Sequence, residues 1–382
     1  MVFERSLRYT WRQETEGFFM KILILTGKFG NGHWSASLSL KEELLRQDPR
    51  VQVEAADFFA YALDEGAEAV YKGFSLLVTH GSALYNMYYN LTQNQKRTSP
   101  DLLAALFSDK LARLLDRERP DLLIATHPFC AQVIAAYKAE TGNTIPLVTC
   151  VTDLSSHSEW VAPGTDGYLV GSPLIRRALA AKGVDPGRIL VTGIPVRSDF
   201  KAPRRSNGSG RRHLLIMGGG LGLMPRSDRF YEALNALPDT DVTILTGTNE
   251  KLRRRLTGKY TNIEVVGFTD RVADYMASAD LLLSKPGGIT LFEAIFSELP
   301  ILAWAPFLQQ EINNAKFLVA AGIGATAEKE QEACLAAIRS LLYDDGALAA
   351  MRCRMRAMKG QLEGESLSAL CAALGRRKGA CA

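Results

Sequence analysis

Residues 20–33 read Met-Lys-Ile-Leu-Ile-Leu-Thr-Gly-Lys-Phe-Gly-Asn-Gly-His, and this stretch decides the fold. Its apolar run predicts a strand at 21–26, its glycines predict a loop at 27–32, and helical periodicity follows over 33–47. A second strand is expected at 51–56. A strand that passes through a glycine loop into a helix and on to another strand is the opening unit of a parallel α/β sheet.

The same alternation continues along the chain. Further strands are expected at 122–124, 146–151, 213–217, 242–246, 263–266, 281–283 and 301–304, a helix at 102–118, and only helices after 304. Residues 201–212 contain no apolar residue except Ala and Pro, which favours a linker. The pattern therefore predicts two Rossmann-like doubly wound domains, residues 20–200 and 213–382, facing a cleft.

Composition agrees with two domains and excludes several classes of protein. The chain has 382 residues, of which 47% are hydrophobic and 23% charged, and a formal net charge of +4. That charge is too weak for wrapping nucleic acid but suits an anionic small ligand or lipid surface. The six cysteines lack the spacing of a zinc site, and a reduced cytosolic compartment is expected. No apolar run is long enough to span a membrane.

Residues 1–19 lack the apolar core of a signal peptide. They are expected to be an N-terminal extension, a loose arm or a misassigned start, ahead of a fold that begins at Met20.

The first glycine loop ends at His33, at or near a helix N-terminus. The positive end of the helix dipole disfavours an imidazolium, so His33 is expected to be neutral and able to act as a base. The alternative is a dinucleotide loop or a capped helix start. The loop spacing is G-x-x-G-x-G, which departs from the G-x-G-x-x-G dinucleotide fingerprint.

A second glycine loop follows the strand at 213–217. Exposed backbone amides in such a loop suit phosphate oxygens, and the alternative is a tight strand-to-helix turn. The glycines are Gly218, Gly219, Gly220 and Gly222.

A third loop, 284–288, leads into a helix whose first turn holds Thr290, with Glu293 three residues later. Thr290 can cap the helix or contact a phosphate. Glu293 can serve the backbone N–H groups of the turn or accept hydrogen bonds from two ribose hydroxyls, and the sequence leaves both open.

The fourth motif is the amide- and carboxylate-rich run at 309–314, after the strand at 301–304. It suits the recognition of sugar hydroxyls, and the alternative is a solvated helix start.

In this order the motifs GNGH, GGGLG, KPGGITLFEA and QQEINNA resemble a family of glycosyltransferases. It includes bacterial diacylglycerol glucosyltransferases, plant monogalactosyldiacylglycerol synthases and the lipid-II-forming enzyme of peptidoglycan synthesis. Residues 151–153, with Trp160 and Pro163-Gly164, are similar to the VTD…W…PG stretch of the diacylglycerol branch. The resemblance covers most of residues 20–345 and implies the GT-B type of two-domain fold.

The resemblance also implies roles for single residues. His33 would be the base that deprotonates the acceptor hydroxyl, and Asp153 would either contact the acceptor or support His33. Glu293 would bind the ribose of the UDP-sugar, and Phe268 would lie against the uracil. The sugar would be contacted by Gln310, Glu311 and Asn314. The phosphates would be bound by the residues of the second and third glycine loops and the helix start after them, namely Gly218, Gly219, Gly220, Gly222, Gly287, Gly288 and Thr290. Gln309 stands where the family pattern has Gly, which leaves glucose and galactose open as the donor sugar.

The implied reaction is a metal-independent, inverting transfer that needs no cofactor besides the UDP-sugar. Asp239-Thr240-Asp241 has the spacing of the metal-binding pair in transferases of the other major fold. It precedes its strand, at the amino end, and is therefore expected to be a polar turn.

Residues 66–92 predict two short aromatic-rich helices followed by Lys96 and Arg97. Phe74, Tyr85, Tyr88 and Tyr89 are expected at the acceptor site or a membrane interface, with the basic residues on anionic lipid. The alternative is a buried helical insertion. Together with the resemblance, this predicts a peripheral enzyme on the cytoplasmic side of the cell membrane, with diacylglycerol as acceptor and no nucleic-acid partner.

Three other functions stay open. A UDP-GlcNAc transferase acting on an undecaprenyl-linked acceptor shares most motifs, but the VTD…W…PG stretch argues against it. A nucleotide-sugar epimerase would need carboxylates around the anomeric carbon and no membrane-facing surface. A nicotinamide-dependent oxidoreductase would need the dinucleotide loop spacing that this chain lacks.

Overall fold

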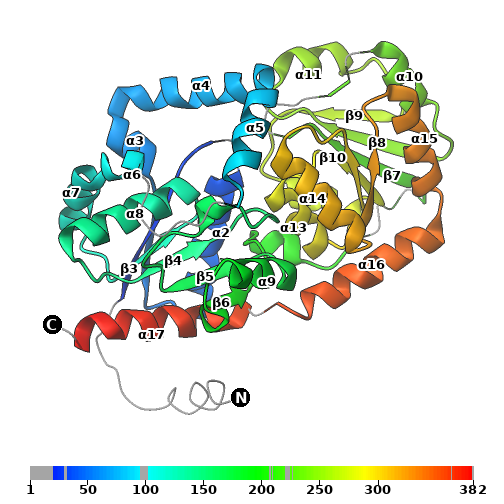
Figure 1. The fold of residues 1–382 in the computed structure, drawn as a ribbon. Coiled ribbons are helices and arrows are strands. Elements are labelled where there is room, and N and C mark those ends of the chain that lie inside the picture. The colour runs from blue at the N-terminus through cyan, green and yellow to red at the C-terminus, as the bar shows by residue number, and fades with distance from the viewer. Residues whose placement is uncertain are drawn as a thin grey trace.

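The computed structural model describes residues 20–29, 32–94, 102–205, 208, 210–219, 224–225, 227–362 and 364–380. Within these ranges the chain forms two six-stranded sheets, and every strand pair in both is parallel. Helices cover both sheets, and the two halves lie side by side (Figure 1). The doubly wound α/β prediction is confirmed.

The first sheet has the order β2-β1-β3-β4-β5-β6. Its strands are apolar and almost fully buried at the centre, because helices cover both faces. They are β1 (Lys21–Thr26), β2 (Gln52–Asp57), β3 (Leu122–Ala125), β4 (Leu147–Cys150), β5 (Gly167–Val170) and β6 (Ile189–Val191). The helices that connect them on the sheet are α2 (Gly32–Gln47), α8 (Pro128–Thr141) and α9 (Pro173–Ala181).

The second sheet has the order β12-β11-β10-β7-β8-β9. Its strands are β7 (Arg212–Met217), β8 (Thr240–Leu245), β9 (Ile263–Val266), β10 (Leu281–Ser284), β11 (Ile301–Trp304) and β12 (Gly324–Ala327). Its helices are α10 (Asp228–Asn235), α11 (Glu250–Leu256), α12 (Val272–Ser278), α13 (Gly288–Phe296), α14 (Gln309–Ala320), α15 (Gln331–Leu342) and α16 (Asp345–Lys359).

Each sheet has one point where the strand order changes direction, between β1 and β3 in the first and between β7 and β10 in the second. Ligands of doubly wound sheets bind outside the carboxyl ends of the strands at such points. The glycine loops after β1, β7 and β10 all begin there, so three of the four sequence motifs share the position that the topology assigns to ligands.

A helical insertion separates β2 from β3. It consists of α3 (Phe58–Leu63), α4 (Ala67–His80), α5 (Ser82–Thr92), α6 (Leu102–Ala105) and α7 (Ser108–Glu118). The two helices predicted in 66–92 are confirmed as α4 and α5, whereas the helix predicted over 102–118 is interrupted between α6 and α7. In Figure 1, α4 runs along the edge of the first domain and α5 descends between the two domains.

The domains meet where α13 begins. A Cβ atom on Gly288 would lie 2.3 Å from the carbonyl oxygen of Thr152, just after β4, so only glycine permits this approach. Phe292, fully buried one turn later, packs against two glycines of the first domain: its ring carbons lie 3.3 Å from the Cβ position of Gly171 and 3.0 Å from that of Gly193. The helix that follows the third glycine loop, α13, thus packs directly against the first domain.

Two expectations about the C-terminal part need correction. The strand β12 lies where only helices were predicted, because the small residues of 324–327 carry a weak strand signal and pair only with β11 at the sheet edge. The helix α17 (Leu367–Ala380) was assigned to the second domain with the rest of 213–382. It packs instead on the first sheet, where Leu367, Cys371 and Leu374 join the core around β1. Residues 1–19 lie outside the described ranges.

Replacing Gly288 by Ala is expected to destabilise the protein, because the new methyl group would lie 2.3 Å from the Thr152 carbonyl oxygen. Such overpacking costs about 1–3 kcal/mol, which thermal unfolding would record as a lower Tm. Gly73→Ala in α4 is the control, since nothing lies within 4 Å of its Cβ position. An unchanged Tm in Gly288→Ala would contradict the contact.

Candidate functional site

His33 occupies the first turn of α2, at the carboxyl edge of the first sheet. Its Nδ1 atom lies 2.9 Å from the carbonyl oxygen of Thr126 and 2.8 Å from Oγ1 of Thr152. A carbonyl oxygen only accepts hydrogen bonds, so Nδ1 carries the proton. The Nε2 atom therefore keeps its lone pair, which is the form of imidazole that can act as a base.

The surroundings of His33 favour the neutral ring but support a transient charge. Burial lowers the pKa of His33, while the carboxylate of Asp153 opposes this shift. Burial also raises the pKa of Asp153, which His33 and a hydrogen bond from the buried Trp160 oppose. Asp153 is thus placed to stabilise a proton taken up by His33, which fits the supporting role among its two predicted roles.

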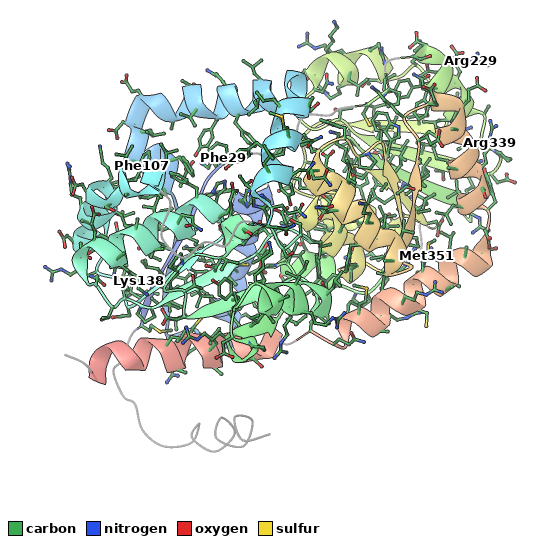
Figure 2. All side chains as sticks on the ribbon, viewed as in Figure 1. Phe29, Phe107, Lys138, Arg229, Arg339 and Met351 are labelled. Carbon is green, nitrogen blue, oxygen red and sulfur yellow. The ribbon has the colours of Figure 1, made fainter. Side chains whose placement is uncertain are left out.

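A second histidine, His127, faces His33 with 4.7 Å between the ring centroids. Its Nδ1 accepts the backbone N–H two residues later, at the start of α8, so its proton lies on Nε2. Burial and the neighbouring His33 hold the pKa of His127 well below its usual range. Phe29 stacks 5.0 Å from His127 and 5.1 Å from Phe74 of α4, which gives the histidine pair an aromatic wall. Figure 2 shows Phe29 between α4 and the body of the first domain.

The N-terminus of α13 lies beside the loop that carries His33. Cγ2 of Ile289 is 3.9 Å from the Cβ position of Gly32. Gly287 is the N-cap residue, and no side chain caps the helix. The amides of the first turn, which includes Gly288 and Thr290, and the positive end of the dipole suit an anion such as a diphosphate.

Glu293 lies one turn further along α13. No side chain caps this helix, so the capping alternative for Glu293 does not hold. Burial raises the pKa of Glu293 to about 7; Asp199 adds to the rise and Arg197 opposes it. A half-buried carboxyl group with these neighbours is suited to accepting the hydroxyls of a ligand.

Two residues of the predicted donor site, Gly219 and Phe268, are accessible to a ligand in the structure. Gly219 has a φ of +69°, in the left-handed region, and nothing lies within 4 Å of its Cβ position, while Gly218 before it is buried. Phe268, after β9, is 71% exposed and offers a free aromatic face. Gly220 and Gly222 lie outside the described residues.

The first turns of α14 contain the three residues predicted to contact the sugar, and only one of them is available. Glu311 lies 3.5 Å from Nζ of Lys285 and accepts backbone N–H groups at 3.2 and 3.4 Å. Asn314 is 1% exposed, donates to the carbonyl of Pro286 at 2.9 Å and accepts from the amide of Leu154 at 3.2 Å. Asn314 therefore bridges the two domains, and its predicted contact with a sugar needs correction. Gln310 is half-buried.

The aromatic residues predicted at the acceptor site or a membrane interface mostly face inward, so the membrane interface is corrected for them and the acceptor site stays a prediction. Tyr89 is buried with its hydroxyl 2.6 Å from Oγ of Ser155, and Tyr85 and Phe74 are half-buried. Tyr88 is 50% exposed. A buried tyrosine needs a partner for its hydroxyl; Ser155 of the first domain supplies it for Tyr89, and Gln310 of the second domain supplies it for Tyr85.

Aliphatic side chains occupy the outer face instead. We call this surface the apolar face; it consists of the exposed apolar side chains of the neighbouring helices α4 and α5, namely Val70, Leu76, Leu77, Leu84, Met87, Tyr88 and Leu91. Exposed apolar groups gathered on neighbouring helices mark a surface for a partner or a membrane. Lys96 and Arg97 lie outside the described residues.

Several residues of the site were not predicted. Thr126 and Thr152 orient His33. Thr126 follows β3, which borders the first switch point, and Thr152 follows the next strand, β4, so their place after these strands is a signal that could have found them. Asn86 of α5 donates to the carbonyl of Phe307 at 2.8 Å and accepts from the amide of Gln309 at 2.8 Å. Nothing in the sequence connects these residues, which are more than 200 positions apart.

Comparisons with known proteins match each half of the chain to a known family. Residues 33–196 match the family model described as monogalactosyldiacylglycerol (MGDG) synthase, and residues 213–355 match the glycosyltransferase family 28 C-terminal domain. The processive diacylglycerol beta-glucosyltransferase of Staphylococcus carnosus is 29% identical over 357 residues, 89% of each chain.

The chain is a glycosyltransferase that joins these two domains. Two solved structures show the same GT-B fold: MurG from Acinetobacter baumannii (16% identity, 91% and 97% of the two chains, TM-score 0.60) and the UDP-GlcNAc 2-epimerase of Neisseria meningitidis (14% identity, 93% and 100%, TM-score 0.58). The fold is therefore common to transferases and epimerases, and only the residues of the site can distinguish the two functions.

Two negative findings concern the described part of this glycosyltransferase. It contains no group of three or more His, Cys, Asp or Glu side chains that could hold a metal ion. None of its helices there is both long and apolar enough to cross a membrane. Asp241 of the predicted polar turn pairs with Arg211 at 2.7 Å, at the amino end of β8.

UDP binding is expected to strengthen as the pH rises from 6 to 8. With a pKa of about 7, Glu293 is mostly protonated at pH 6 and ionised at pH 8, and in its predicted role the ionised carboxylate would accept both ribose hydroxyls. Calorimetry should show about tenfold tighter binding at pH 8, the factor by which the ionised fraction grows. Glu293→Gln is the control, because whatever pH dependence it retains belongs to the phosphates. Equal pH dependence in both proteins would contradict the role of Glu293.

Proposed function

We propose that this glycosyltransferase moves a hexose, glucose or galactose, from a UDP-sugar to the hydroxyl of diacylglycerol, with inversion and without a metal. One observation carries the proposal: the uncapped N-terminus of α13 lies beside the loop of His33, whose Nε2 is the free base. A base for the attacking hydroxyl and a site for a departing anion are the two groups that a single displacement at a sugar requires.

The proposed reaction is one step. Nε2 of His33 takes the proton of the diacylglycerol hydroxyl while the hydroxyl oxygen bonds to the anomeric carbon. The bond between that carbon and the UDP oxygen breaks, and its electron pair leaves with UDP. Amides of α13 stabilise the negative charge of UDP, and Asp153 stabilises the imidazolium. Attack opposite the leaving group converts an α-linked donor into a β-linked glycolipid.

The lipid acceptor is supported by the apolar face and by the name of the S. carnosus relative. The apolar face lies on the same insertion whose inner side packs against the aromatic wall at His127, so a lipid bound there would be close to His33. We infer a peripheral position on the cytoplasmic side of the cell membrane. On the described part of α4, Lys72 is paired with Glu68 at 3.0 Å, so attraction to anionic lipid would depend on Lys96 and Arg97.

The transfer is tested with purified protein, diacylglycerol in mixed micelles, EDTA, and UDP-glucose or UDP-galactose offered separately. A glycolipid from one donor is expected, and His33→Ala should lower its rate by about 10²–10⁴-fold, the usual contribution of a general base. UDP affinity should stay unchanged in the variant, which shows that it is folded. Product from UDP-GlcNAc and an undecaprenyl-linked acceptor only, or epimerised UDP-sugar only, would replace the proposal with that function.

Membrane binding is expected to depend on the apolar face. Leu84→Ser/Leu91→Ser removes two side chains of α5 that are 58% and 69% exposed. Burying one leucine contributes about 1.5–3 kcal/mol, so co-sedimentation with phosphatidylcholine vesicles should weaken at least about tenfold. Val319→Ser, which removes a 50% exposed side chain of α14 in the second domain, is the matched control. The idea fails if both variants bind vesicles like the unchanged protein.

A further inference from the structure

Helix α5 has two faces with different partners. Leu84, Met87 and Leu91, spaced three and four residues apart, belong to the exposed apolar face. Tyr85, Asn86 and Tyr89 point the other way, toward α14 of the second domain. The same helix therefore contacts the outside of the molecule and the segment that was predicted to contact the donor sugar.

Two sets of polar contacts join α5 to the start of α14. The hydroxyl of Tyr85 donates to Oε1 of Gln310 at 2.9 Å. Asn86 pairs through both ends of its amide with the backbone at Phe307 and Gln309. These contacts form a polar seam across the domain boundary, and the seam exists only while the two domains are together.

The first domain holds α5 firmly. His157 is buried, and its Nδ1 accepts the amide of Glu159 at 3.2 Å, so the proton lies on Nε2. Nε2 donates to the carbonyl of Tyr89 at 3.1 Å. Lys182 and Ser158 both donate to the carbonyl of Gln93, just after the helix. Helix α5 is thus fixed to the loop that carries Asp153, and Tyr85 keeps its place relative to His33.

The hydrogen bond from the Tyr85 hydroxyl determines which end of the Gln310 side-chain amide is available to a ligand. A hydroxyl that donates to Oε1 occupies the carbonyl end and leaves the NH₂ group of Nε2 for another acceptor. The other amides of the segment are engaged: Gln309 donates to Asn313 at 3.2 Å, and Asn314 donates to Pro286. Among the described residues, none accepts a hydrogen bond from Nε2 of Gln310. This NH₂ group is the donor that the segment offers to a ligand.

We propose that Tyr85 is a positioning residue for the donor sugar: it holds Gln310 with its NH₂ group directed at a hydroxyl of the hexose. The inference rests on the proposed function. It adds that Tyr85, a residue of the first domain, takes part in recognition of the donor sugar by the second domain. Recognition of the hexose then depends on α5 being seated on α14, whereas binding of the UDP part, at α13, does not.

The test compares UDP with UDP-hexose binding in the full-length protein without lipid, by calorimetry, using the UDP-hexose that the transfer assay selects. Tyr85→Phe removes one neutral hydrogen bond, so UDP-hexose should bind about 3- to 10-fold more weakly while UDP binds as before. In the transfer assay KM for the donor should rise by a similar factor, with kcat changed less.

A double-mutant cycle with Gln310→Ala tests whether Tyr85 acts through Gln310. Tyr85→Phe/Gln310→Ala should bind UDP-hexose no more weakly than Gln310→Ala alone. Tyr343→Phe is the matched control, because its hydroxyl is also bonded, to Thr240 at 2.7 Å, at the amino end of β8. It should change neither affinity.

Two results would overturn the inference: equal weakening of UDP and UDP-hexose in Tyr85→Phe, or additive effects of the two substitutions. If the unchanged protein binds UDP but no UDP-hexose, the inference and the proposed function both fail. If transfer to diacylglycerol is absent but the cycle behaves as described, the inference about the sugar holds and the acceptor is wrong.

Discussion

The close approach of Gly288 to the carbonyl of Thr152 is the contact on which the site depends. It brings the uncapped N-terminus of α13 against the edge of the first sheet, where the hydroxyl of the same threonine bonds His33. One residue thus touches both the base and the helix that would receive the leaving group. Phe292 packs against two glycines of the first domain and thereby fixes the position of α13 relative to that domain. A side chain at position 288 would separate the two groups that the chemistry needs together.

Under the proposed function, the helical insertion would supply the acceptor side of this centre. Its inner side is aromatic and polar and contacts both His127 and α14, while its outer side is aliphatic and exposed. Helix α5 contacts the second domain through its inner side, and under the proposed function its outer side would contact the lipid surface.

Much of the fold was predictable because each glycine loop directly follows an apolar strand, which determines both the parallel sheet and the position of His33. The faces of α5 were not predictable, since tyrosines occur on both sides of the helix, with Tyr88 exposed and Tyr89 buried, and hydropathy does not distinguish a membrane from another domain. Asn314 was misassigned because an amide that bridges two backbones has the same chemistry as one that binds a sugar. The return of α17 to the first sheet depends on contacts with Met20 and β1, more than 300 residues away.

The anomeric configuration of the first glycolipid formed tests the central claim most directly, because a single displacement by the deprotonated hydroxyl fixes it. Proton NMR of the product made from an α-linked UDP-hexose and diacylglycerol should show the large anomeric coupling of a β-glycoside. A product with the small coupling of an α-glycoside would contradict a one-step reaction with His33 as its base.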